Sequence, residues 1–307
     1  MSILKNKKLL FVLTFIFVFI CFFYIQFPND RLKRRLEFEI EKNTQFDAQI
    51  DKIKILPLLK IQINGLKLSR NDQQILISKA VIKPSILSLL SKDIIVKYDI
   101  NVFKGSAQGD IIITKDSGQL QSMIVKVESL DVDEFTQIYS HSAKENIEIK
   151  GLLSGNMNLS SNNTGDFDFY IEDLDILKIK IKTFDLPQFT DLRSNLKGQI
   201  YRDRTIINEL KFDNEDITLK LKGSTPPLWR LSKGSIDLLY RVDVRSKKYA
   251  LLKSFLNKDN KGNVAGKIVG SLQKPQLKNV NDSNAQPKRQ QGPRFRKTFS
   301  PKKQQAI

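Results

Sequence analysis

The chain has 307 residues, of which 51 are Lys or Arg, 33 are Asp or Glu, one is His and one is Cys. One cysteine excludes a disulfide framework within the chain, and one histidine with one cysteine excludes a zinc site of three or four such ligands. The net charge of +18 lies partly at the ends, since residues 1–35 and 281–307 each hold seven basic and one acidic side chain. The nearly balanced body between them lacks the basic footprint of a nucleic-acid-binding protein, so we predict no nucleic-acid partner.

The first element is an uncharged apolar segment that runs from Leu9 to Asn29. About 20 helical residues span the hydrocarbon core of a bilayer, so the segment predicts a transmembrane anchor. A cleaved signal peptide is the alternative, but it requires a shorter apolar region and a small-residue cleavage site, which this segment lacks. Basic residues flank both sides in similar number and leave the orientation open. The candidate anchor residues are Leu9, Phe11, Phe15, Phe19, Phe23 and Phe27.

A short amphipathic helix is predicted directly after the anchor. Leu32, Leu36 and Ile40 are four residues apart and therefore share one helical face. This spacing predicts a helix over 30–43, with Asp30 able to cap its start.

Apolar and polar residues then alternate with a period of two, which predicts about a dozen antiparallel strands. The alternation changes phase at Asn64 and Gly65, and this slip predicts a bulge or a tight turn. The clearest alternating segments are 46–51, 59–63, 94–102, 123–127, 167–171, 177–181, 217–221 and 236–244.

Three further short helices are predicted between the strands. They begin at Pro84, at Asp131 and at Lys247, because proline favours a first helical position and Asp131 has the capping-box spacing to Glu134. A weak repeat, K-G-x-x-x-G, occurs at 104–109, 150–155 and 261–266. Glycine in a strand allows a bend, so repeated copies would curve a sheet into a trough.

The composition divides the chain into three parts. Residues 1–29 are predicted to be a short stub and anchor, the stub being cytoplasmic only in the orientation that the resemblance described below implies, residues 30–272 a β domain, and residues 273–307 a disordered basic tail rich in Gln, Pro, Lys and Arg. Within the tail, 300–303 resembles the SPKK element of DNA minor-groove binders. A single copy is typical of solvated tail, and contact with acidic headgroups or cell-wall polymers is the alternative.

Candidate catalytic residues are few. His141 is the only histidine, and nothing in the sequence marks a nucleophile or water for it to activate. Asp131, Asp133 and Glu134 lack the sixth-position glycine and twelfth-position carboxylate of a calcium loop, so helix capping explains them better. No nucleotide-binding or hydrolase motif is present. We therefore predict no enzymatic activity, no cofactor and no metal.

The apolar face of the predicted sheet is its most informative feature, because such a face must be covered. Three short helices are few for a dozen strands. Either the sheet packs on itself or something apolar, such as phospholipid acyl chains, fills the remainder. The candidate residues lining such a groove are Ile94, Val96, Tyr98, Ile100, Val102, Leu177, Ile179 and Ile181.

The order of these elements resembles the AsmA-like proteins, and among them the family of type II secretion system protein N, GspN. The similarity covers about residues 9–272, and Pro57–Ser69, Pro84–Leu90 and Gly105–Gly109 match best. The resemblance implies a mainly β fold, in which a transmembrane helix precedes an elongated, curved antiparallel sheet that forms a groove. It has no catalytic residue to carry over.

The resemblance also implies a place and a role. The protein would lie in the bacterial inner membrane as a single-pass protein, with its main domain in the periplasm. It would be a non-enzymatic accessory component of type II protein secretion, with other secretion subunits as partners. The alternative that the same resemblance implies is an AsmA-like protein that binds or transfers lipid in the envelope.

Overall fold

The computed structural model describes residues 11, 14, 15, 18, 26–44, 46–70, 73–134, 147–181, 184–185, 187–227, 234–250, 256–259, 262–271 and 274–279. Within these residues the chain is mainly β, with a few short helices. The N-terminal half contains α2 (Asn29–Asn43), β1 (Asp47–Leu56), β2 (Lys60–Arg70), β3 (Gln73–Pro84), η2 (Leu87–Leu90), β4 (Asp93–Val102), β5 (Gly105–Thr114), β6 (Leu120–Asp131) and β7 (Ile147–Ser160). The C-terminal half contains β8 (Gly165–Ile181), β9 (Phe184–Asp185), β10 (Phe189–Ile200), β11 (Thr205–Asp213), β12 (Ile217–Thr225), β13 (Ser235–Val244), η4 (Lys247–Tyr249), β14 (Val264–Ser271) and β15 (Lys274–Lys278).

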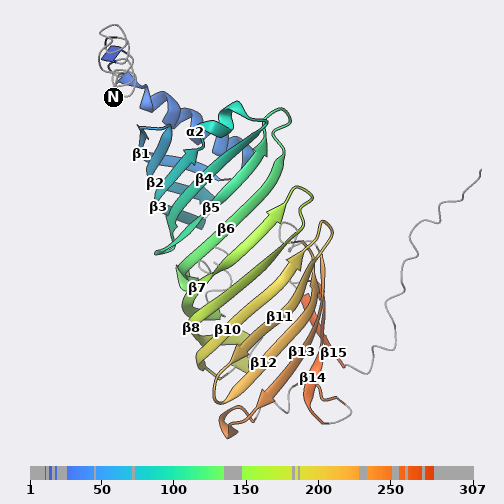
Figure 1. Ribbon diagram of the computed structural model, residues 1–307. Coiled ribbons are helices and arrows are strands. Elements are labelled where there is room, and N and C mark those ends of the chain that lie inside the picture. The colour runs from blue at the N-terminus through green and yellow to red at the C-terminus, as the bar shows by residue number, and fades with distance from the viewer. Residues whose placement is uncertain are drawn as a thin grey trace, which may run out of the picture.

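The strands form one long, twisted antiparallel sheet in which each strand pairs with the next along the chain (Figure 1). The two-residue β9 is set aside from this order and pairs only with β8 among the described residues. Because the order is a meander, all odd-numbered strands from β1 to β7 end at one edge of the sheet. This confirms the predicted antiparallel β architecture.

Helix α2 covers one face of the first strands. Its predicted apolar residues Leu32, Leu36 and Ile40 pack against a cluster of buried residues from β1, β2 and β3. At the same contact, Glu37 accepts a hydrogen bond of 2.7 Å from the backbone N–H of Ile50. The helix begins at Asn29 without a side-chain cap, so Asp30 lies in its first turn and does not cap it. The buried members of this N-terminal cluster are Ala48, Ile50, Ile53, Ile63, Leu66 and Ala80.

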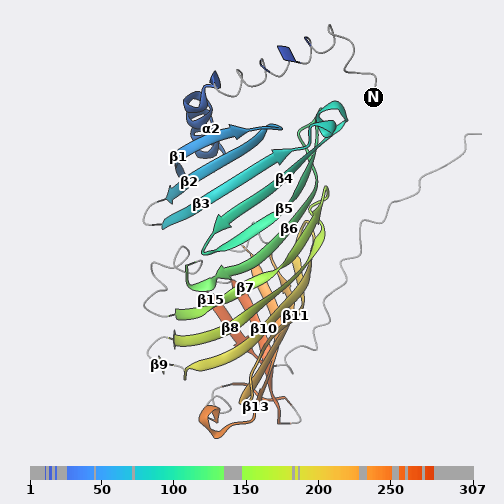
Figure 2. The same ribbon diagram turned by 60° about the vertical axis from the view of Figure 1, so that its left-hand side comes forward.

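The C-terminal half curls (Figure 2) and contains a larger core. Tyr249 in η4 reaches back across the sheet to β10, where its ring stacks on Phe189 with centroids 5.0 Å apart. Its hydroxyl donates a hydrogen bond of 3.0 Å to the carbonyl of Gln188. The buried members of this C-terminal cluster are Leu174, Phe189, Leu192, Ile217, Tyr240, Val242, Val244, Tyr249 and Val264.

Most of the predicted anchor lies outside the described residues. Leu9, Phe19 and Phe23 are among those not described, whereas Phe11 and Phe15 are helical and exposed and Phe27 is half-buried. None of the helices that the structure describes is long and apolar enough to span a membrane.

The predicted helix at Pro84 is wrong in type. Pro84 is the last residue of β3, and a single turn of 3₁₀ helix, η2, follows three residues later. Serine hydroxyls hold this turn: Ser88 donates to the carbonyl of Ser85 at 2.7 Å and Ser91 donates to that of Ser88 at 2.9 Å. Side-chain bonds of this kind compete with an α-helix and favour tight turns. The helix predicted at Lys247 is likewise a 3₁₀ turn in its described part, and the one predicted at Asp131 is described only through Glu134.

The phase slip at Asn64 and Gly65 occurs inside β2, where Gly65 adopts a left-handed φ of +63°. The register between β1 and β2 continues unchanged, yet the buried residues switch from Ile63 to Leu66 on β2 and from Ile53 to Ile50 on β1. Both strands therefore rotate their side chains at the same point, which keeps one face apolar.

Two boundaries differ from the sequence interpretation. Segments 167–171 and 177–181, read as two strands, are one strand, β8. The sheet also extends past residue 272, because Lys274–Lys278 form β15 rather than the start of the tail.

Replacement of Ile50 by alanine tests the N-terminal cluster. Ile50 has no exposed surface, so Ile50→Ala leaves a cavity under α2 and is expected to lower the free energy of unfolding by about 2–5 kcal/mol. The matched control is Gln49→Ala, since Gln49 is exposed on the opposite face of the same strand. Urea unfolding of the full chain in detergent, followed by circular dichroism, measures both. Equal effects of the two variants would contradict the cluster.

Candidate functional site

The strand register aligns apolar residues in a row that crosses the whole sheet. Each member of this first row is the cross-strand partner of the next, so the row runs perpendicular to the strands. With strands about 4.8 Å apart, a row from β1 to β15 is about 60 Å long. Its members are Ile55, Ile61, Ile82, Tyr98, Gly109, Val125, Met157, Phe167, Gly198, Ile207, Gly223, Leu238, Ile268 and Leu277.

A second row lies beside the first on the same face and extends from β1 to β14. It contains no polar side chain apart from the hydroxyl of Tyr240, and it connects the two clusters, since Ile53 and Ile63 belong to one and Tyr240 to the other. Its members are Ile53, Ile63, Ala80, Ile100, Ala107, Val127, Gly155, Phe169, Leu196, Leu210, Leu221, Tyr240 and Gly266.

The middle of this two-row face is incompletely covered. Helix α2 packs on β1–β3 and η4 packs near β10, but β5, β6 and β7 have their neighbouring strands as their main described contacts. There the first row remains half-buried, as at Tyr98, Val125 and Met157, whereas Val127 and Gly155 of the second row are buried. Partly exposed apolar patches occur at protein or membrane interaction sites and in ligand-binding grooves, so this part of the sheet is the candidate site.

Every aromatic residue of the two rows lies against a glycine on the adjacent strand. A Cβ added at Gly109 would approach the hydroxyl oxygen of Tyr98 to 2.8 Å, and one at Gly198 would approach the ring of Phe167 to 2.4 Å. The pairs Gly155 with Phe169 and Gly266 with Tyr240 are equally close, at 2.6 Å and 2.4 Å. Because glycine leaves this space free, the large rings lie along the sheet and the apolar face stays even.

The predicted groove residues on β4 all belong to this face. Ile94, Val96, Tyr98, Ile100 and Val102 are half-buried and alternate with exposed Lys97, Asp99 and Asn101. Burial raises the pKa of the Tyr98 phenol above its ordinary value, and the carboxylate of Asp110 adds to this shift. The phenol therefore stays neutral, and it donates a hydrogen bond of 3.0 Å to the carbonyl of Ile124.

The predicted groove residues on β8 are placed less uniformly. Leu177 is half-buried beside a register shift between Glu148 and Ile149 on β7, and the neighbouring Ile176 packs against the C-terminal cluster. The side chains of Ile179 and Ile181 lie outside the described residues. The structure thus brings the five β4 residues together and leaves the β8 residues beyond a bulge.

The opposite face of the sheet is mainly polar, with a few exposed apolar residues such as Ile124. Lys197 on β10 pairs with Asp168 on β8 at 2.9 Å, and Lys126 pairs with Glu128 along β6 at 2.6 Å. These pairs are solvent-exposed and contribute little to stability. They show that the outer face of these strands is charged, whereas the inner face of the same strands is apolar.

The three copies of K-G-x-x-x-G fall at the start of β5, within β7 and in the turn leading into β14. Gly109, Gly155 and Gly266 end the copies, and all three lie in the apolar rows. The repeat therefore marks where an aromatic ring needs space on a neighbouring strand. Spacing alone did not reveal this, because the partner ring comes from a different strand.

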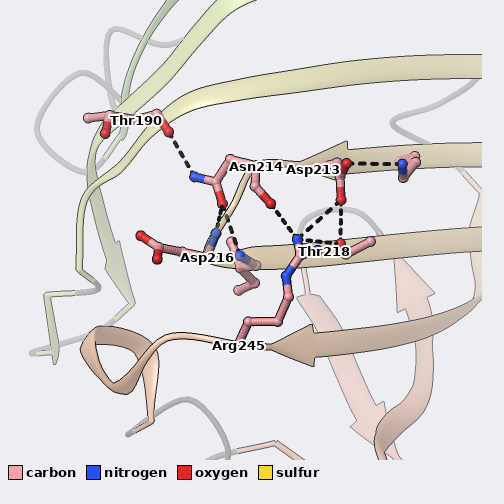
Figure 3. Close-up of polar contacts among 8 residues, drawn as sticks. Thr190, Asp213, Asn214, Asp216, Thr218 and Arg245 are labelled. Carbon is pink, nitrogen blue, oxygen red and sulfur yellow. Dashed lines mark hydrogen bonds and ion pairs between the residues drawn. The ribbon is translucent and has the colours of Figure 1, made fainter.

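A polar network closes the far edge of β11–β13 (Figure 3). Arg245 donates to the hydroxyl of Thr218 at 3.0 Å, to the carboxylate of Asp213 at 3.5 Å and to the carbonyl of Asn214. The Asn214 side chain donates to the carbonyl of Thr190 at 2.9 Å and accepts from the next turn's backbone N–H groups. The network joins the ends of four strands and therefore stabilises this end of the sheet.

The acidic group at Asp131 also has a structural explanation. Asp131 accepts a hydrogen bond of 3.0 Å from the backbone N–H of Asp133, as capping predicts. Lys104 pairs with Asp131 at 3.2 Å and with Glu134 at 2.9 Å. His141 lies outside the described residues, and the described part of the chain contains no group of three or more potential metal ligands.

The fold and its apolar face define the class of protein: a long antiparallel meander that carries one uninterrupted apolar face past two local cores. Comparison with protein-family models, curated proteins and solved structures finds no match for this chain.

The pH dependence of stability tests the network at Asp213. Its hydrogen bond from Thr218 holds the pKa of the Asp213 carboxyl below its ordinary value, and Lys211 and Arg245 act in the same direction. A depressed folded-state pKa stabilises the fold above the unfolded pKa of about 3.9, and this contribution is lost as pH falls through the folded value. The stability gap between wild type and Asp213→Asn is therefore expected to be larger at pH 6 than at pH 2.5, measured by urea midpoints. A gap independent of pH would contradict this role.

Proposed function

We propose that this protein is a non-enzymatic, membrane-anchored envelope protein that binds phospholipid acyl chains along its two apolar rows. The observation that carries the proposal is the continuity of these rows from β1 to β14, including β5–β7, where no described element packs over them. Acyl chains require an apolar surface and no directed polar contact. The even surface formed by the glycine–aromatic pairs suits a long, flexible chain.

The dimensions support more than one lipid chain at a time. An acyl chain of a phospholipid extends over roughly half of a bilayer core about 30 Å thick, whereas the first row is about 60 Å long. Burial of apolar surface provides about 25 cal/mol per Å². Several chains lying across β4–β8 would therefore complete the burial that α2 and η4 begin at the two ends.

The proposed location rests on the resemblance and on the predicted anchor. An AsmA-like protein with an anchor over residues 9–29 would lie in the bacterial inner membrane with its sheet in the periplasm. With an anchor at one end of the sheet, the apolar rows lead away from that membrane. The protein would then hold lipid chains that have left the bilayer.

Site-specific photo-crosslinking tests the proposal in native membranes. The full chain carries a benzoylphenylalanine in place of Val125, which is half-buried in the first row on β6. Irradiation of envelopes with ³²P-labelled phospholipid is expected to yield a labelled protein band. The matched control places the same probe at Ile124, which is 48% exposed on the opposite face of the same strand, and no such band is expected there.

A charged substitution in the first row tests the same binding face. Val125→Glu buries an unpaired carboxylate where acyl chains lie, so it is expected to lower the lipid crosslinking of a probe at Met157, the next residue of the row, several-fold. Ile124→Glu adds the same charge to the outer face and is expected to leave crosslinking unchanged. Equal crosslinking in the two variants would overturn the proposed binding face.

An accessory role in type II protein secretion is the second candidate, and the order of elements shared with the protein N family favours it. In that case the apolar face would be covered by a secretion subunit. The same probe at position 125 distinguishes the two, because it would give a protein adduct of defined mass without labelled lipid. Reduced secretion of a type II substrate in a strain lacking the protein would then be expected.

A further inference from the structure

We propose that the edge of the sheet carrying the β1–β2 and β3–β4 connections is a second membrane contact, which inserts leucines into the interface of an anionic bilayer. Leu58 in the first connection is 72% exposed, and Leu87 and Leu90 in η2 are 81% and 88% exposed. Both connections follow odd-numbered strands and therefore lie at the same edge of the sheet (Figure 2). The inference goes beyond the binding of acyl chains but rests on the proposed anchor.

The leucines of η2 are held outward by a rigid turn. Ser88, between them, is buried, donates a hydrogen bond to the carbonyl of Ser85 and accepts one of 3.0 Å from the backbone N–H of Ile95 on β4. Lys115, from the β5–β6 connection, donates a hydrogen bond of 3.1 Å to the carbonyl of Leu89. These hydrogen bonds fix the backbone at Ser88 and Leu89, so the turn itself holds the side chains of Leu87 and Leu90 in solvent. Ile86 is also exposed, at 44%.

The charge of the same edge fits anionic headgroups. Lys60, Lys83, Lys92 and Lys115 flank the exposed leucines, against two carboxylates, Asp93 and Asp116. Basic residues near an anionic membrane surface strengthen binding to it electrostatically. Exposed apolar residues surrounded by lysines are the composition of an interfacial membrane contact, whereas a buried protein interface is depleted in lysine.

The course of α2 brings this edge toward the bilayer. Glu41 contacts the backbone N–H of Ala48 and Glu37 contacts that of Ile50, so α2 runs back along β1. The start of α2, directly after the predicted anchor, is therefore displaced toward the end of β1, where Leu58 lies. The anchor and the exposed leucines approach the membrane from the same end of the sheet.

The test uses the full chain in vesicles of phosphatidylethanolamine and phosphatidylglycerol, with Cys21→Ser as background. Leu87→Cys carries an NBD fluorophore, whose emission is expected to shift to the blue and to be lost when nitroxide-labelled phospholipid is included. The matched control is Leu76→Cys. Leu76 is 61% exposed on β3 but about 26 Å along the strand from Pro84, and its probe is expected to stay quenched by aqueous iodide.

Each other outcome overturns the inference. A probe at position 87 that remains accessible to iodide in floated vesicles shows that the edge stands in water. A blue-shifted probe that nitroxide lipid does not quench reports a protein contact instead of a membrane. If the full chain does not float with the vesicles, both the proposed anchor and the second membrane contact are contradicted. Acyl-chain binding is read separately by the crosslink at position 125, so loss of one result leaves the other intact.

Discussion

The need to cover one apolar face is the constraint on which the rest of this structure depends. Antiparallel alternation places Lys97 and Asp99 on one side of β4 and Val96 and Tyr98 on the other, and cross-strand pairing extends the apolar side onto the neighbouring strands. A single-layer sheet with such a face is not stable alone in water. Helix α2 covers the first strands and η4 packs against the last ones, whereas the main described contacts of the middle strands are with their neighbouring strands.

Glycine placement determines how that face is shaped. On β5, Gly109 leaves room for Tyr98, and on β7, Gly155 leaves room for Phe169. A side chain at either position would force the neighbouring ring to stand away from the sheet. Glycine at these positions lowers local stability, since it has no side chain to pack and loses more backbone entropy on folding than other residues do. A sheet that only had to bury its own face could fill these positions, so an even surface is the more economical explanation of the pattern.

Alternation in the sequence predicts β4 and β13 closely and the central or first part of β6 and β12, and the spacing of Leu32, Leu36 and Ile40 predicts α2, because each signal is local. The helix expected at Pro84 fails because serine hydroxyls bind the turn's carbonyls. The rows could not be predicted, since they depend on register, and a one-residue bulge such as that beside Leu177 moves a side chain off its row. The network at Asp213 was missed for the same reason: Thr190, Asp213 and Arg245 meet only once three connections are in place.

The charges and the exposed leucines make the N-terminal end of the sheet different from its C-terminal end. The N-terminal end combines the predicted anchor, four lysines and the exposed leucines of η2, which are the features behind the proposed membrane contact. The rows begin at this end, at Ile53 and Ile55 on β1, and pass outward to Ile268 and Leu277. A surface of about 60 Å is short for crossing an envelope alone. The last strand, β15, is short and carries Lys274, Pro275 and Lys278, a composition that disfavours pairing with a further strand, so any partner that extends the surface has to contact the apolar rows themselves.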